Sequence, residues 1–248
     1  MHFPMASRIP ILGVPIDPVT MEEAVTCVLS MLHGLKQCHV MTPNNEMLVE
    51  ADRNAAFKSV LQRSDLNLPD STGLLWAARR TGERIPERVS GVDFVERLCG
   101  ALDQSIPVFF LGGRGGAAEK AAEKFGMRNS EFGIAGVFEG SPKDMDADQI
   151  IQAVNTSGAK LLLVAYGAPK QDLWIAKHLS KMPTVRVAIG VGGTFDFLSG
   201  TIKRAPRWLR SLGLEWLWRL ILQPWRIKRI WTAVVIFPML VLMSKKQN

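Results

Sequence analysis

Glycine-rich loops follow three of the apolar segments in the second half of the chain. They occupy residues 112–116 and 167–171 and the pair Gly192-Gly193. Glycine lets backbone N–H groups approach a ligand closely, and a helix N-terminus behind such a loop adds partial positive charge. If the preceding segments are parallel strands, the loops meet at one edge of the sheet, where they suit a diphosphate.

A carboxylate, Asp70, ends a short apolar segment in the first half of the chain. It lies between Pro69 and a Ser-Thr-Gly turn, where an aspartate is often a turn-forming or helix-capping residue. From spacing alone, this structural interpretation and a chemical one have equal weight. Thr42, Asn44 and Asn45 end a neighbouring apolar segment, and they fit helix capping equally well.

Two further patterns suggest other chemistry, and both are weak. Residues 113–118 fit the loose G-x-G-x-x-G/A pattern of NAD-binding loops, but a tight turn explains these glycines about as well. Residues 144–148 contain three aspartates but lack the glycine and the terminal glutamate of a calcium loop. Acidic residues in the first turn of a helix favour the helix dipole, so we expect no metal site there.

The positive charge of the chain is concentrated at its C-terminal end. Residues 1–202 hold 20 Lys/Arg and 22 Asp/Glu, whereas residues 203–248 hold ten Lys/Arg and one acid, Glu215. Five of the seven tryptophans lie in the same segment: Trp208, Trp216, Trp218, Trp225 and Trp231. This composition favours an anionic membrane surface as partner. Nucleic acid is less favoured, because no helix-turn-helix or similar motif accompanies the charge.

Cysteine spacing and apolar run lengths indicate a cytoplasmic protein. Cys27, Cys38 and Cys99 form no CxxC pair and are expected to be buried thiols. The N-terminus lacks the apolar run of a signal peptide. The longest apolar run, residues 233–243, is shorter than the ~20 residues that span a bilayer, and Pro238 interrupts it. We expect this run to lie at the membrane interface or to pack on the body, and it leaves homo-oligomer formation open.

The elements that position these residues follow an α/β pattern. Four apolar segments alternate with three helical patterns in the second half, which predicts parallel strands with right-handed crossovers. These four strands are expected at residues 108–111, 134–138, 161–165 and 185–191. In the first half we expect strands at 9–16, 38–41 and 66–68, a capping box at 20–23, and one helix from about 45 to 62.

The predicted fold is therefore α/β: a Rossmann-like parallel sheet flanked by helices, with a basic amphipathic C-terminal helical appendage. Residues 1–202 are expected to form the catalytic domain, and residues 203–248 the membrane-associating appendage.

Seven blocks of sequence, from about residue 11 to 229, together resemble one family. They are TPNNEM, LPDSTG, RVSGVDF, FFLGG, GAPKQD, GVGGTFDFLSGTIKRAP and GLEWLWRLILQPWRIKR. They resemble the WecG/TagA/CpsF glycosyltransferases, glycosyltransferase family twenty-six. The resemblance implies an inverting enzyme with neither metal nor cofactor, at the cytoplasmic face of the bacterial inner membrane. Such enzymes move a sugar from a UDP-sugar to an undecaprenyl-diphosphate-linked saccharide. The implied sugar is N-acetylmannosamine or its uronic acid, with glucose, used in exopolysaccharide assembly, as the alternative.

The resemblance also implies roles for individual residues. Asp70 matches the general base, and Thr42 the polar residue beside it. Arg88 matches a contact to the donor diphosphate, Gln171 and Asp196 match uridine-binding positions, and the donor loops contribute Gly112, Gly113, Gly192 and Gly193. Acceptor or diphosphate binding is implied for Asn44 or Asn45 and for Arg219, Arg226 and Arg229. Two departures are Asp172, where glutamate is common, and residues 233–243, which extend beyond the shared blocks.

Overall fold

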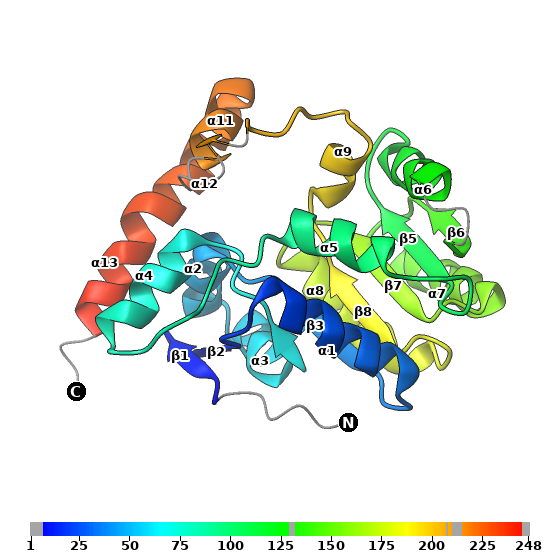
Figure 1. The fold of residues 1–248 in the computed structure, drawn as a ribbon, viewed down its shortest axis with the longest axis horizontal. Coiled ribbons are helices and arrows are strands. Elements are labelled where there is room, and N and C mark those ends of the chain that lie inside the picture. Colours follow the sequence, from blue (N-terminus) through cyan, green and yellow to red (C-terminus); the bar gives the residue numbers. More distant parts are fainter. Residues whose placement is uncertain (1–6, 129–131, 207, 210–214, 245–248) are drawn as a thin grey trace.

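A six-stranded parallel sheet with the strand order β4-β3-β8-β7-β5-β6 forms the centre of the molecule (Figure 1). The computed structural model describes residues 7–128, 132–206, 208–209 and 215–244. The strands are β3 (Cys38–Met41), β4 (Leu66–Asn67), β5 (Val108–Gly112), β6 (Ile134–Phe138), β7 (Leu161–Ala165) and β8 (Val187–Gly190). The predicted α/β class is confirmed, and the two short early strands extend the same sheet as the four later ones.

Helices cover both faces of this sheet. One face carries α1 (Met21–His33), α5 (Gly91–Gly100), α6 (Ala117–Arg128) and α9 (Thr194–Leu198). The other carries α7 (Asp144–Ser157) and α8 (Lys170–His178), which the short helix η1 (Leu179–Lys181) extends.

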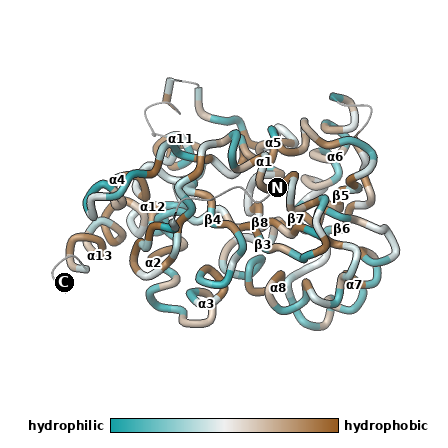
Figure 2. The backbone as a smooth tube through the Cα atoms, turned by 60° about the horizontal axis from the view of Figure 1, so that its bottom comes forward, coloured by the Kyte–Doolittle hydropathy of each residue, from teal (hydrophilic) through white to brown (hydrophobic). Residues whose placement is uncertain are grey.

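Side chains along the central strands alternate between these two layers. Val108 and Phe110 belong to a first apolar cluster, beneath α1, α5, α6 and α9. Phe109 and Leu111 belong to a second apolar cluster, beneath α7 and α8. Because successive strand side chains point to opposite faces, a strand covered on both faces is apolar throughout. Figure 2 shows this apolar character along the central strands.

A third apolar cluster lies beside the sheet and joins the two ends of the chain. It combines the antiparallel hairpin β1 (Ile9–Ile11) and β2 (Val14–Ile16) with α2 (Asn45–Arg53), α3 (Ala55–Arg63) and α4 (Thr72–Arg80). Phe237 and Val241 of the C-terminal helix complete it, with 0% and 6% of their surface exposed. The body therefore binds the C-terminal helix through side chains that the N-terminal half supplies.

We refer to residues 203–248 as the appendage. After α11 (Glu215–Leu222) comes a helical run made of η2 (Pro224–Arg226), α12 (Ile227–Trp231), the π-helix η3 (Thr232–Ile236) and α13 (Phe237–Ser244). This 21-residue run is long and apolar enough to cross a membrane by length and composition alone, and little of it is buried. It is longer than the apolar run seen in the sequence, because the helix begins nine residues earlier, at Pro224.

Two local predictions in the first half were wrong. The single strand expected over residues 9–16 is a hairpin, because Leu12 and Gly13 both have positive φ and reverse the chain. The helix expected from 45 to 62 is two helices. Asn54 separates them. Its N–H donates to the Glu50 carbonyl, which closes the last turn of α2, and its side chain accepts from the N–H of Phe57, which caps the start of α3. The capping box of Thr20 and Glu23 is confirmed.

Burial of Phe237 predicts how firmly the C-terminal helix is held. Phe237→Ala leaves a cavity in the third cluster and is expected to lower the free energy of opening of α13 by about 3–5 kcal/mol. Met239→Ala is the matched control, because Met239 lies on the same helix, is 51% exposed, and should change that free energy by less than about 0.5 kcal/mol. Native-state hydrogen exchange of the amides of residues 240–244 measures both. Equal exchange in the two variants would contradict the docking.

Candidate active site

The carboxyl ends of the strands open into a crevice between β7 and β5, where the order of the strands reverses. From β5 the chain continues to β6 on one side, whereas from β7 it continues to β8 on the other. Ligands of open α/β sheets bind at such a point. A cavity of about 550 Å³ lies there, lined by the loops after β3, β5, β7 and β8. We call it the polar cavity; its wall includes Gly113, Tyr166, Gln171, Gly192, Gly193 and Asp196.

Gln171 joins two of these loops beneath the polar cavity. Its Oε1 accepts hydrogen bonds from the N–H groups of Gly167 and Gly192, each at 2.9 Å. The strand must come very close, since a Cβ at Gly190 would lie 2.6 Å from the Gln171 Nε2 and 2.3 Å from an oxygen of Asp172. Gln171 therefore lies in the cavity wall, as its predicted role in uridine binding requires. Its side-chain oxygen, however, already accepts two hydrogen bonds from the backbone.

Asp196 faces arginines from the appendage across the polar cavity. Burial raises the pKa of its carboxyl, and the charges of Arg219 and Arg226 oppose this rise. The Arg219 guanidinium stacks on the ring of Phe197 at 4.4 Å, while its Nε is buried without a hydrogen-bond partner among the described residues. An arginine held this way keeps donors available for an anion.

A second cavity of about 540 Å³ lies between the body and the appendage, and we call it the appendage cavity. Its apolar wall comes from α4, α11 and the long C-terminal helix and includes Trp76, Trp216, Ile230 and Val234. Six residues line both cavities: Asn44, Asp70, Val92, Phe197, Arg219 and Arg226. Asp70 therefore lies where a polar space meets a largely apolar one.

Asp70 and Thr42 converge above the first residue of α5. A Cβ at Gly91 would lie 3.3 Å from the Thr42 Oγ1 and 3.4 Å from the Asp70 Oδ2, so glycine permits this approach. Burial raises the pKa of Asp70 to about 7, while the charge of Arg88 and a backbone hydrogen bond from Gly91 lower it. A carboxyl that titrates near neutral pH can accept a proton as a general base.

Glu215 is a site residue that the sequence analysis missed. It begins α11 and lies between two arginines, with its Oε2 4.0 Å from Arg88 and its Oε1 3.5 Å from Arg204. Arg204 also binds both carboxylate oxygens of Asp93 on α5. The sequence did contain a sign of this role, because Glu215 is the single acidic residue of the appendage, which has ten basic ones.

The other predicted residues lie at the cavities with one exception. Asn44 caps α2, and Arg226 donates to the Gln223 side chain at 3.0 Å. Arg88 was predicted to contact the donor diphosphate. It lines the appendage cavity and does not line the polar cavity. Asn45 lines the appendage cavity too, and Arg229 lines the polar cavity while paired with Glu46. Gly112 lines neither, because it packs against the backbone of Ala165, 3.0 Å from where its Cβ would be.

The weak metal pattern at residues 144–148 shows no ligand-like cluster. Asp144 pairs with Lys177 at 2.7 Å, and Asp146 accepts from the Ser141 hydroxyl. Among the residues that the structure describes, no three His, Cys, Asp or Glu side chains are grouped closely enough to hold a metal ion.

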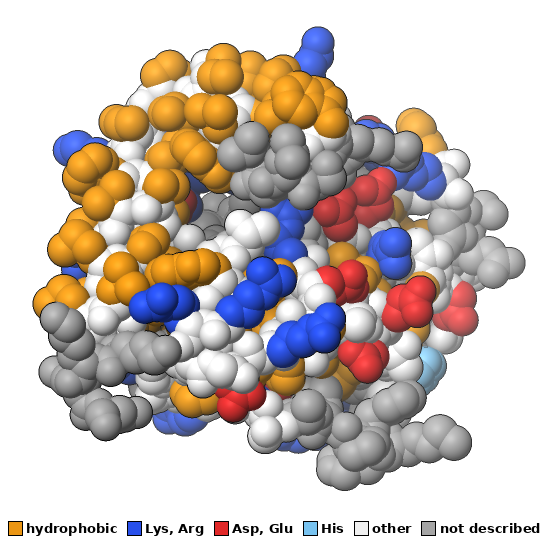
Figure 3. All heavy atoms as spheres, turned by 60° about the vertical axis from the view of Figure 1, so that its left-hand side comes forward, with side chains coloured by type: hydrophobic (Ala, Val, Ile, Leu, Met, Phe, Trp, Pro, Cys, Tyr) orange, Lys and Arg blue, Asp and Glu red, His pale blue; other side chains and the backbone are white. Residues whose placement is uncertain are grey.

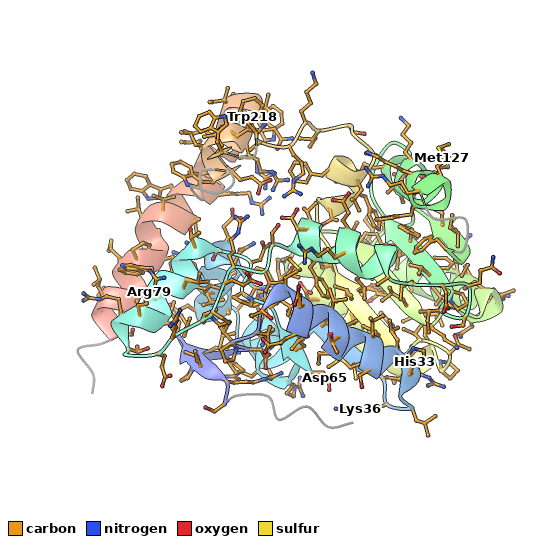
Figure 4. All side chains as sticks on the ribbon, in the orientation of Figure 1. His33, Lys36, Asp65, Arg79, Met127 and Trp218 are labelled. Carbon is orange, nitrogen blue, oxygen red and sulfur yellow. The ribbon has the colours of Figure 1, made fainter. Side chains whose placement is uncertain are left out.

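The outer side of the appendage carries a continuous apolar surface. Figure 3 shows these side chains gathered over the helices of the appendage, with Lys and Arg near their margin. Figure 4 places Trp218 at one end of the appendage and Arg79, on α4, beside its other end. We call this the apolar surface; its residues are the exposed apolar ones of the appendage helices that line neither cavity: Leu217, Ile221, Leu222, Ile227, Trp231, Met239, Leu242 and Met243.

Comparison with known proteins relates the whole chain to one group of enzymes. Residues 9–248 match the profile described as "Glycosyl transferase WecG/TagA/CpsF family". A protein of Bacillus subtilis (strain 168) is 34% identical over 194 residues, which cover 77% of this chain and 74% of that protein. One of Bacillus spizizenii is 32% identical over 196 residues, covering 79% and 75%. Both are named N-acetylglucosaminyldiphosphoundecaprenol N-acetyl-beta-D-mannosaminyltransferase.

Proposed function

The chain belongs to the WecG/TagA/CpsF family and is a glycosyltransferase, and from this premise we propose which transfer it catalyses. The proposed reaction moves N-acetylmannosamine, or its uronic acid, from a UDP-sugar to an undecaprenyl-diphosphate-linked saccharide. The observation that carries the proposal is the position of Asp70 at the junction of two cavities, one suited to each substrate.

The polar cavity suits the nucleotide donor. Its glycine loops carry no side chains that would keep phosphate oxygens away from the backbone, and the carboxylate of Asp196 suits the single N–H of the uracil ring, at N3. Arg219 and Arg226 lie at its border with the appendage cavity, where the diphosphate would accumulate negative charge as the sugar leaves. Fixed arginines in a dry site stabilise such charge.

The appendage cavity suits the lipid-linked acceptor. Its tryptophans and aliphatic side chains match the lipid end, and Arg88 at its wall suits the diphosphate that links lipid and sugar. Bound in this way, the acceptor brings a sugar hydroxyl toward Asp70. The carboxylate accepts the hydroxyl proton while the oxygen attacks the anomeric carbon and UDP departs. Direct attack from the face opposite UDP inverts the anomeric centre and needs one carboxylate only.

A lipid-linked acceptor requires the enzyme to work at a membrane, and the apolar surface fits this need. Tryptophan favours the headgroup layer, and each Lys or Arg near an anionic surface adds about 1 kcal/mol. We propose that the appendage lies on the cytoplasmic face of the inner membrane and presents Asp70 to the acceptor's headgroup.

Replacing the proposed base tests the mechanism. Asp70→Asn keeps the shape of the side chain but removes its ability to take a proton. Turnover is expected to fall at least about a hundredfold, while the dissociation constant of UDP measured by calorimetry stays within about twofold of wild type. Turnover near the wild-type value would exclude Asp70 as the base.

The raised pKa of Asp70 also predicts a pH profile. The carboxyl must lose its proton to act, so kcat/KM for the acceptor should rise with pH through about 7 and then level off. Arg88 lowers this pKa, so Arg88→Gln should move the rise to higher pH whatever it does to the maximal rate. A rise that stays in place or moves to lower pH in Arg88→Gln would contradict the assignment.

Membrane binding through the apolar surface is tested by vesicle flotation. Ile227→Asp combined with Trp231→Asp places charge on two side chains that are 54% and 58% exposed. Binding to vesicles with anionic lipid should fall at least about tenfold, since burying these carboxylates is costly. Leu35→Asp is the control, because Leu35 is 89% exposed and follows α1, on the opposite side of the molecule (Figure 1). Equal loss in both would refute the orientation.

A further inference from the structure

The long C-terminal helix changes its hydrogen-bond pattern at one place. Over η3 it is π-helical, and the N–H of Phe237 donates to the carbonyl of Thr232, five residues back instead of four. In this pattern the Ala233 carbonyl would accept from the N–H of residue 238. Residue 238 is proline, which has no N–H, so this carbonyl loses its partner within the helix.

Asn45 on α2 supplies the missing donor. Its Nδ2 donates to the Ala233 carbonyl at 2.9 Å, and its Oδ1 accepts from the Ser71 hydroxyl at 2.7 Å. Ser71 directly follows Asp70. One amide therefore connects the C-terminal helix, 188 residues away in the chain, with the loop that carries the proposed base.

Neither Asn45 nor Ser71 has the local role that its position suggests. The side-chain cap of α2 is Asn44, so α2 does not need Asn45 as its cap. Ser71 is the N-cap residue of α4, yet it makes no side-chain cap hydrogen bond there and donates to Asn45 instead. Space is also kept for the amide, because a Cβ at Gly73 would lie 2.3 Å from both its oxygen and its nitrogen.

We propose that Asn45 is a positioning residue that sets the register of the C-terminal helix on the Asp70 loop. Ile230, Ala233, Val234 and Pro238 of this helix form one wall of the appendage cavity, so a shift along the helix axis would change the space beside Asp70. Pro238 and Asn45 act as a pair: the proline exposes one carbonyl, and only one docked register brings the amide to it. The consequence for turnover rests on the proposed function, whereas the docking does not.

The test replaces the hydrogen-bond donor of Asn45 and keeps the size of the side chain. Asn45→Asp still accepts from Ser71 but places an oxygen against the Ala233 carbonyl, so the helix should lose its register. We expect faster hydrogen exchange at the amides of residues 239–244, at least a tenfold lower kcat with the lipid-linked acceptor, and UDP affinity within about twofold of wild type. Asn54→Asp is the matched control, because an aspartate keeps the capping oxygen of α3 and should change none of these.

A second substitution tests the pairing with the proline. Pro238→Ala restores an N–H, which lets the helix pair four residues back so that Phe237 satisfies Ala233. In the Asn45→Asp background, this change should slow the exchange again and raise kcat at least threefold above the single variant, as a double-mutant cycle measures.

Two outcomes would overturn the proposal. One is hydrogen exchange in Asn45→Asp that equals the wild type, and a lower kcat in that case would make Asn45 a substrate contact. The other is a double variant no better than the single one. If the wild-type protein fails to transfer sugar from any UDP-sugar tested, the proposed function is wrong, and the exchange measurements still decide the register.

Discussion

The packing of two C-terminal side chains into the N-terminal half of the chain holds the candidate site together. Phe237 and Val241 are buried with the hairpin and with α2 to α4. Because this helix docks there, the basic segment before it is brought across the open edge of the sheet (Figure 1). Without that contact the polar cavity would lose Arg219 and Arg226, and the appendage cavity would lose most of its apolar wall.

The same docking contributes to the electrostatics of Asp70. Burial favours the protonated carboxyl, while Arg88, Arg219 and the backbone of Gly91 favour the charged form. Arg219 belongs to the appendage, as does Glu215, which opposes its effect by raising the pKa. The pKa of the proposed base is therefore set partly by residues that lie beside it only when the appendage is docked.

One helix has two different surfaces for two different tasks. Its inner side binds the body through apolar packing and the Asn45 amide, whereas its outer side exposes Trp231 and Met239. Membership of the family shows that the chain is a glycosyltransferase, and the names of its two relatives refer to a lipid-linked acceptor. Under the proposed function this arrangement has a physical reason: an acceptor that stays in the bilayer has to be met at the membrane surface, and the helix beside the cavity exposes apolar side chains there.

Four features could be predicted from the order of the amino acids: the α/β class, the strands of the second half, the glycine loops at the sheet edge, and the basic, tryptophan-rich character of the appendage. These features follow from local periodicity and composition, which neighbouring residues express directly. Three other features became visible in the folded chain alone: Glu215 lies between Arg88 and Arg204, Gly112 packs away from the cavity, and Asn45 contacts Ala233. Such contacts join segments far apart in the chain, and they depend on how apolar faces pack, which a period of 2 or 3.6 residues does not specify. The hairpin turn and the break at Asn54 were missed for a more local reason, because one residue's φ or one capping side chain outweighed the apolar pattern around it.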